Sequence, residues 1–300
     1  MIRVLSWAAA VLIGGASALS AAPEWNRVRT WVYQLTGYPG GKLDRIAAAP
    51  FDLAVIDLSR DGGDDYFTRA EITAVKRSGK IVLAYFEIGA IESYRPEWKD
   101  VPDELKAGAV AGWPKEQYVR YWDKRWWPVV KGRIDQALAA GFDGAYLDMI
   151  TTYEEIQGIG IEREELARRM VDLIARVSRY AKKQAPGFRI VPQNCPELYT
   201  WSAWEPSPNK TYIRAIDGIG LESVFFLAHD KPATAAWCRE NRENALQILE
   251  QGKLVLGVDY AKKRANIVDA YRRQLGLGFI PYVSVEALDR IVPEPGGVAR

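Results

Sequence analysis

The strongest constraint on the fold is an alternation of strand-like and helix-like segments that runs from residue 30 to residue 284. Eight short runs rich in β-branched and aromatic residues, bounded by Gly, Asp or Pro, are typical of strands. They are Thr30–Tyr38, Asp52–Ser59, Lys80–Gly89, Asp143–Met149, Phe188–Asn194, Asp217–Ser223, Lys253–Tyr260 and Gly278–Ser284. Strands that alternate with helices predict a parallel sheet with right-handed crossovers.

The segments between these strands contain the signals that begin and end helices. Thr68 is followed three residues later by Glu71, which fits a capping box. Pro128 fits the first turn of another helix. The predicted helices cover about 68–79, 128–141, 162–184, 233–251 and 261–275.

Eight such units in residues 23–300 predict a single-domain (β/α)₈ TIM barrel. A doubly wound open sheet is the alternative. Two connections are long, at 90–127 after the third strand and at 195–216 after the fifth. Because active sites of such barrels lie at the carboxyl ends of the strands, we expect these two loops to build the functional face.

The N-terminus predicts export. Arg3 precedes an apolar segment over residues 4–18, and the small-residue run ALSAAP follows. This layout is typical of a secretory signal peptide, here residues 1–22, with a retained membrane anchor as the alternative. We therefore expect a secreted or periplasmic protein with no membrane insertion after cleavage. A disulfide between Cys195 and Cys238 is possible in such a compartment, and the sequence leaves it and the oligomeric state open.

Composition excludes several classes of function. The formal charge of +2 offers no global field for nucleic acid. With His229 as the single histidine, an imidazole-based metal site or a Ser-His-Asp triad is not expected. A Mg²⁺ or Ca²⁺ site built from scattered carboxylates is a minor alternative. We expect no metal and no cofactor.

Acidic residues stand at the ends of five predicted strands, and a barrel would bring them together at its mouth. They are Asp57, Glu87, Asp148, Glu222 and Asp259. Each acid alone can be a helix cap or an ion-pair partner. Glycoside hydrolysis, however, needs two carboxyl groups in different protonation states. Asp148 and Glu222 end two copies of the frame DG-x-x-L-acid, so we predict them as the nucleophile and the acid/base.

Five stretches carry a family resemblance: FDLAVIDLSRDG, KIVLAYFEIGAIESYRPEW, YWDKRWWPVVKGRIDQALAAGFDGAYLDM, FRIVPQN and IDGIGLES. Together they resemble glycoside hydrolase family 114, which includes the endo-α-1,4-polygalactosaminidases. The similarity extends from Trp31 to Ser284. It implies a (β/α)₈ barrel and a retaining hydrolase of galactosamine-containing exopolysaccharide. By motif, Asp148 matches the nucleophile and Glu222 the acid/base.

The resemblance also implies substrate-binding residues. The predicted substrate contacts are Asp57, Glu87, Glu92, Tyr94, Arg95, Tyr146, Gln193, Asn194, Asp259 and Tyr260. One departure stands out, because many relatives have Gly-Glu where this chain has Gly89-Ala90, with Glu87 and Glu92 on either side. That difference puts the substrate contacts of this subsite in question.

The sequence thus predicts an exported endo-acting hydrolase of an α-1,4-linked galactosamine polymer, which is cationic when deacetylated and suits an acidic mouth. Two alternatives remain open. One is a barrel that binds polysaccharide without turnover. The other is a transglycosylase or another α-glycosidase acting on a different polysaccharide.

Overall fold

The computed structural model describes residues 24–201 and 209–296. The predicted signal peptide, residues 1–22, lies outside the described residues. Within the described ranges, no helix combines the length and the apolar character needed to cross a membrane.

The fold is built on eight parallel strands that coincide with the eight predicted from the sequence. They are β1 (Trp31–Tyr33), β2 (Leu53–Asp57), β3 (Ile81–Glu87), β7 (Gly144–Asp148), β8 (Arg189–Pro192), β9 (Gly218–Glu222), β12 (Leu254–Tyr260) and β13 (Ile280–Ser284). The first five pair in the order β1-β2-β3-β7-β8, and the last three pair in the order β13-β12-β9. All pairings within these two sheets are parallel.

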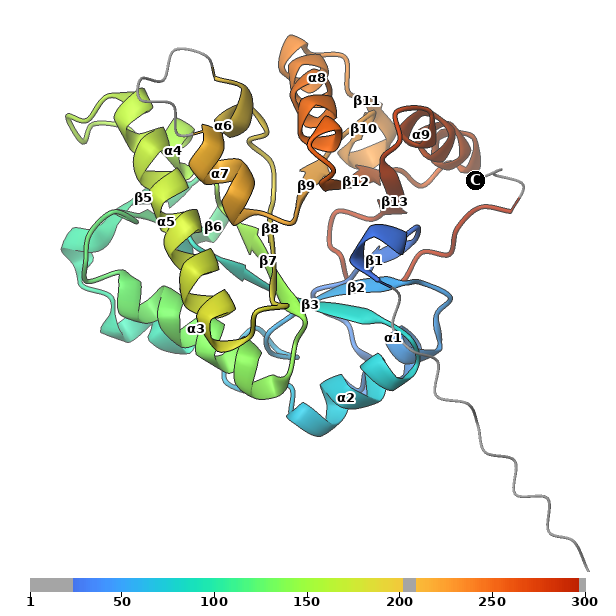
Figure 1. Cartoon of the computed structure of the whole chain (residues 1–300), viewed down its shortest axis with the longest axis horizontal. Coiled ribbons are helices and arrows are strands. Elements are labelled where there is room, and N and C mark those ends of the chain that lie inside the picture. Colours follow the sequence, from blue (N-terminus) through green and yellow to red (C-terminus); the bar gives the residue numbers. More distant parts are fainter. Residues whose placement is uncertain (1–23, 202–208, 297–300) are drawn as a thin grey trace, which may run out of the picture.

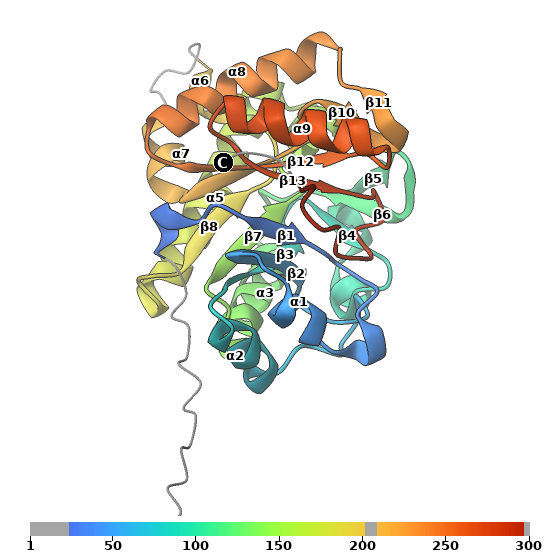
Figure 2. The same cartoon turned by 90° about the vertical axis from the view of Figure 1, so that its right-hand side faces the viewer.

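Contacts at two seams join the sheets into the cyclic order of a (β/α)₈ barrel. At one seam, a parallel bridge joins Gln193, which lies just beyond β8, to Gly220 in β9. At the other, β1 and β13 are neighbours, and the Trp31 indole donates a 2.9 Å hydrogen bond to the Ile280 carbonyl. The predicted fold class is therefore confirmed (Figures 1 and 2).

Helices surround the strands on the outside (Figure 2). They are α1 (Asp44–Ala48), α2 (Arg69–Arg77), α3 (Trp127–Ala140), α4 (Thr152–Glu155), α5 (Arg163–Gln184), α6 (Glu197–Thr200), α7 (Asn209–Ala215), α8 (Ala236–Glu250) and α9 (Arg264–Gly276). The capping box predicted at Thr68 and Glu71 is present at the start of α2. The α3 helix begins with Pro128 in its first turn and ends at Gly141, which adopts a left-handed conformation.

The long connection after β3 has a sheet of its own. Three antiparallel strands, β4 (Ala90–Glu92), β5 (Lys106–Val110) and β6 (Trp113–Val119), lie in the order β4-β6-β5. The sequence did not predict them, because they are short and β5 and the start of β6 are largely exposed, so their apolar alternation is weak. Two further short strands, β10 (Phe226–Leu227) and β11 (Lys231–Pro232), form a hairpin after β9.

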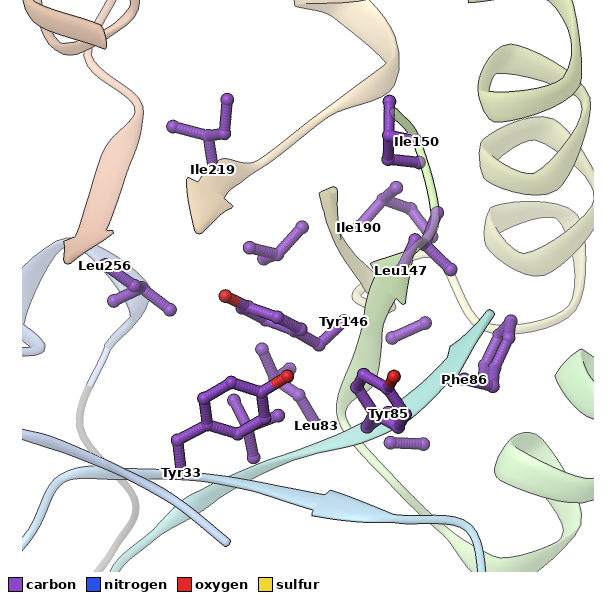
Figure 3. Packing of buried hydrophobic residues seen from close by; sticks show 14 of the residues in the cluster. Tyr33, Leu83, Tyr85, Phe86, Tyr146, Leu147, Ile150, Ile190, Ile219 and Leu256 are labelled. Atoms are coloured by element: carbon purple, nitrogen blue, oxygen red, sulfur yellow. The ribbon is translucent and has the colours of Figure 1, made fainter. Parts of the chain in front are cut away.

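Aromatic rings fill the interior of the barrel. Tyr146 packs against Trp31 and Tyr33, with ring centroids 6.2 and 5.2 Å away (Figure 3). On β9, a Cβ added at Gly220 would lie 1.8 Å from the Tyr146 hydroxyl oxygen. A glycine is required there because the tyrosine ring takes the space of a side chain. Cys195 and Cys238 are both buried as free thiols, so the disulfide left open by the sequence is not formed.

One buried ion-pair network ties the connection after β3 to the barrel. The Arg95 guanidinium donates to both Asp57 oxygens at 2.8 and 2.9 Å and to both Glu92 oxygens at 2.8 and 2.9 Å. All three residues are buried. Although burial alone would raise it, the neighbouring Arg95 lowers the pKa of Glu92 to about 2.

We predict that Arg95→Met lowers the free energy of unfolding by about 3–5 kcal/mol, because it leaves two buried carboxylates without their cation. Urea unfolding followed by circular dichroism at neutral pH measures the change. The matched control is Arg125→Met, which removes a bidentate pair with the surface residue Asp123 and should leave stability nearly unchanged. Equal effects of the two substitutions would contradict a stabilising role for the network.

Candidate active site

Asp148 lies at the carboxyl end of β7, where its carboxylate is partly exposed. Its Oδ2 accepts a 2.6 Å hydrogen bond from the Tyr85 hydroxyl, and its Oδ1 accepts one of the same length from the Met149 backbone N–H. Burial and the nearby Glu222 raise the pKa of Asp148 to about 7, although both hydrogen bonds act against that rise.

Glu222 lies at the carboxyl end of β9 and is also partly exposed. Its Oε1 accepts a hydrogen bond from the Tyr260 hydroxyl, and its Oε2 accepts one from the Asn194 side-chain amide at 3.0 Å. The backbone N–H of Glu222 donates in turn to the Asn194 side-chain oxygen at 3.0 Å. Asn194 therefore fixes both the backbone and the carboxylate of this residue.

The backbone turns sharply after each of the strands that bear these groups. Met149 follows Asp148 with φ of 59°, and Ser223 follows Glu222 with φ of 53°. Asn194, which lies just beyond the intervening strand β8, also has a positive φ, at 64°. Left-handed backbone is uncommon outside glycine and tends to gather at functional sites. Here it occurs at the ends of three adjacent strands around one pair of carboxyl groups.

Several predicted substrate contacts instead hold other side chains. Gln193 accepts a 2.9 Å hydrogen bond from the Tyr33 hydroxyl beneath the pair. Asn194 and Tyr260 both position Glu222. Tyr146 is fully buried, so it packs the interior of the barrel (Figure 3).

Two acids at strand ends, both predicted to contact substrate, are buried and held by other groups. Asp259 is 0% exposed, and its carboxylate accepts hydrogen bonds from the Phe225 and Phe226 backbone N–H groups and from the Gln274 amide. Asp57 is 4% exposed and is held by Arg95. With their oxygens occupied inside the fold, both acids have a structural role in place of the predicted contact with substrate.

Tyr94 and Arg95, two neighbouring residues predicted to contact substrate, lie in different surroundings. Arg95 and Glu92 are buried in the network with Asp57, so they hold the connection after β3 in place and are not free to bind a sugar. Tyr94 is 49% exposed, and its hydroxyl donates to Glu92 at 2.8 Å. Of these residues, only Tyr94 presents an aromatic face to solvent.

Next to the pair lies a group of acids that the sequence revealed only in part. Glu87 ends β3 at 2% exposure, and burial together with Glu92 and Glu116 raises its pKa well above the usual value. Glu116, on β6, was not predicted. Burial and the nearby Asp148 and Glu92 raise its pKa to about 8. Only the antiparallel pairing of β4 with β6, which sets Glu116 opposite Glu92, brings it here.

Across the described ranges, no three His, Cys, Asp or Glu residues are grouped so as to hold a metal ion. The site provides two carboxyl groups, each oriented by a tyrosine and a second donor, and the pKa of one of them, Asp148, is raised to about 7. A pair of this kind serves acid/base and nucleophilic catalysis at an acetal carbon.

Comparisons with solved structures agree with the barrel. The crystal structure of Ega3 from Aspergillus fumigatus in complex with galactosamine has a TM-score of 0.68 and 15% identity, and covers 90% of this chain and 97% of that one. The glycoside hydrolase domain of PelA from Pseudomonas aeruginosa has a TM-score of 0.69 and 16% identity, and covers 88% and 97%. At such identities the likeness concerns the fold.

Sequence comparisons establish the family. A Deinococcus radiodurans protein described as uncharacterized is 32% identical over 280 residues, which is 91% of this chain and 85% of that protein. A Thermotoga maritima protein with the same description is 28% identical over 273 residues, or 86% and 81%. The profile of glycoside-hydrolase family GH114 matches residues 14–299. The chain therefore belongs to glycoside hydrolase family GH114.

Proposed function

We propose that this protein is an exported, endo-acting glycoside hydrolase that cleaves α-1,4-linked galactosamine-containing exopolysaccharide. The observation that supports it most is the pair Asp148 and Glu222, partly exposed at the ends of β7 and β9 and oriented by Tyr85 and Tyr260. The galactosamine bound in Ega3, a protein of the same fold, favours an amino sugar as the substrate unit.

We assign the two carboxyl groups different tasks. Asp148 is short and fixed at its strand end by Tyr85 and the Met149 N–H, which suits a nucleophile that attacks the anomeric carbon. Glu222 has the longer reach and protonates the departing glycosidic oxygen. Water then attacks the glycosyl–Asp148 ester, and Glu222 takes its proton, so the anomeric configuration is retained.

The position of the proton is the main requirement of this mechanism. The raised pKa of Asp148 means that the pair holds a proton near neutral pH. Two interacting carboxyl groups titrate as a unit, so one proton can serve either. For turnover it must lie on Glu222 when substrate is bound, and a cationic sugar beside Asp148 would favour that arrangement by stabilising the Asp148 anion.

Export is part of the same proposal. The charged start, short apolar segment and ALSAAP run of residues 1–22 support a cleaved signal peptide. An exported hydrolase would meet a polysaccharide outside the cytoplasm, where such polymers accumulate.

We predict that Asp148→Asn and Glu222→Gln each lower kcat on a partly deacetylated α-1,4-galactosamine polymer at least about a hundredfold, because each removes one half of the acid–nucleophile pair. Mass spectrometry of the products measures this. The matched control is Glu104→Gln, an exposed acid in the connection after β3, which should cleave normally.

The same reaction tests the stereochemistry. Proton NMR in the first minutes should show the α-anomer as the first new reducing end. Normal hydrolysis in either site variant would refute the assigned residues, and a β-anomer would refute retention. Binding of the polymer by the unmodified chain without any product would support a binding barrel in place of an enzyme.

We predict that kcat/KM falls above pH about 7, as the pair loses its remaining proton. Tyr85→Phe removes a hydrogen bond that stabilises the Asp148 anion, so the pKa rises and the falling limb moves to higher pH by about half a unit or more. Measuring kcat/KM on one polymer from acid to alkaline pH locates the pH at which activity falls. The amines of the substrate titrate in the same way for every variant, so a difference between variants comes from the protein.

The control for this profile is Tyr38→Phe, which removes a buried hydroxyl that donates to the Gln34 carbonyl, away from the pair. Its pH profile should match that of the unmodified chain. If the fall in kcat/KM of Tyr85→Phe occurred at lower pH than in the unmodified chain, the tyrosine would not stabilise the carboxylate.

A further inference from the structure

The sheet β4-β6-β5 holds Glu116 against the end of β7. Ile88, just before β4, donates its backbone N–H to the Asp148 carbonyl at 3.0 Å, and Val119 at the end of β6 donates to the Gly89 carbonyl at 2.9 Å. A Cβ at Gly89 would lie 2.0 Å from the Met149 carbonyl oxygen, so the backbones are in close contact here. The pairing of β6 with β4 sets Glu116 opposite Glu92 on this anchored sheet, and its carboxyl group is near enough to Asp148 for that acid to raise its pKa.

Glu116 has no partner for its charge. It is 7% exposed, and its Oε1 has no hydrogen-bond partner within the described residues. Arg95, the cation that acts on Glu116, already donates its hydrogen bonds to Asp57 and Glu92. A buried carboxyl group without a hydrogen-bond partner lowers the stability of the fold. A ligand that binds it would supply the missing partner.

We propose that Glu116 is a specificity-determining residue that binds the ammonium group on C2 of the sugar unit whose C1 is attacked by Asp148. This inference rests on the proposed function, since it requires an amino sugar at the cleavage site. C2 is bonded directly to the reacting carbon C1, so a group that recognises the substituent on C2 must lie near the nucleophile. Glu116 meets this condition and lacks a cation that an ammonium would supply.

The surroundings of Glu116 explain how it would discriminate. The titratable and charged groups that face it are Asp148 on β7, Glu92 on β4, Glu87 on β3, Glu155 on α4, Tyr118 on β6 and Arg95. These groups and burial keep it protonated at neutral pH, as its pKa of about 8 indicates. An incoming ammonium would expel that proton and form a charge-assisted hydrogen bond. A hydroxyl in the same place could form only a neutral hydrogen bond with the protonated carboxyl group, which is weaker than the charge-assisted one.

The test uses the full mature chain with Glu222→Gln to stop turnover. Calorimetry at a slightly acidic pH gives the Kd of two probes that differ only at C2, the α-1,4-linked tetrasaccharides of galactosamine and of galactose. Repeating the calorimetric titrations in buffers with different ionisation enthalpies gives the number of protons released on binding. The same measurements follow with Glu116→Gln, Glu116→Asp and the exposed control Glu104→Gln.

We expect the preference for galactosamine over galactose to fall about tenfold or more in Glu116→Gln, as expected for the loss of one charge-assisted hydrogen bond. About one fewer proton should be released on binding, because the residue that gives it up is gone. Glu116→Asp should keep part of the preference, and Glu104→Gln all of it. A purely structural role for Glu116 would weaken both ligands equally and leave the proton count unchanged.

The outcomes separate the two proposals. If the unmodified chain cleaves the galactosamine polymer and the preference does not depend on residue 116, this inference is wrong and the proposed function stands. If the chain neither cleaves that polymer nor binds either tetrasaccharide, the proposed function fails and the inference fails with it. A misfolded Glu116→Gln protein, detected by circular dichroism, leaves the decision to Glu116→Asp.

Discussion

The site depends on how the protein accommodates many carboxyl groups at one end of a barrel, where one buried arginine, Arg95, is hydrogen-bonded to two of them. Arg95 is shared fully between Asp57 and Glu92. The other acids must be satisfied by neutral donors or must keep a proton, because an isolated charge is costly in a desolvated place. Neutral donors occupy the oxygens of Asp148 and Glu222, although the pKa of Asp148 is still raised to about 7, whereas burial and neighbouring acids raise the pKa values of Glu87 and Glu116. This division determines which acids can act as anions in catalysis.

The neutral donors come from the same residues that pack the barrel. Tyr85 packs against Tyr33 in the interior and turns its hydroxyl to Asp148. Tyr33 in turn donates to Gln193, so two hydroxyls of the aromatic layer hold side chains at strand ends of the site. Figure 3 shows the packing of Tyr33, Tyr85 and Tyr146. The close approach of Tyr146 to Gly220 leaves little room for these rings to shift. Core packing therefore helps to set the positions of Asp148 and Glu222, and under the proposed function substitutions in this layer should affect activity as well as stability.

The sequence was sufficient for the eight strands, the capping box at Thr68 and the position of Asp148 and Glu222 at strand ends, because local patterns and repeated frames encode them. It was not sufficient for the role of Asp57 or Asp259. Both end apolar strands just as Asp148 does, and only the tertiary partners Arg95 and the Phe225 and Phe226 N–H groups distinguish them. Glu116 escaped detection because it reaches the site through long-range strand pairing.

A strand-end acid becomes reactive or structural according to how its oxygens are satisfied and whether solvent reaches it. Asp259 accepts three hydrogen bonds and has no exposed surface, so nothing remains with which to meet a substrate. Asp148 and Glu222 each accept two, one per oxygen, and both stay partly exposed. A carboxylate oxygen has capacity for more than one hydrogen bond. The difference between scaffold and catalyst at this barrel mouth is therefore the acceptor capacity and solvent access that the fold leaves free.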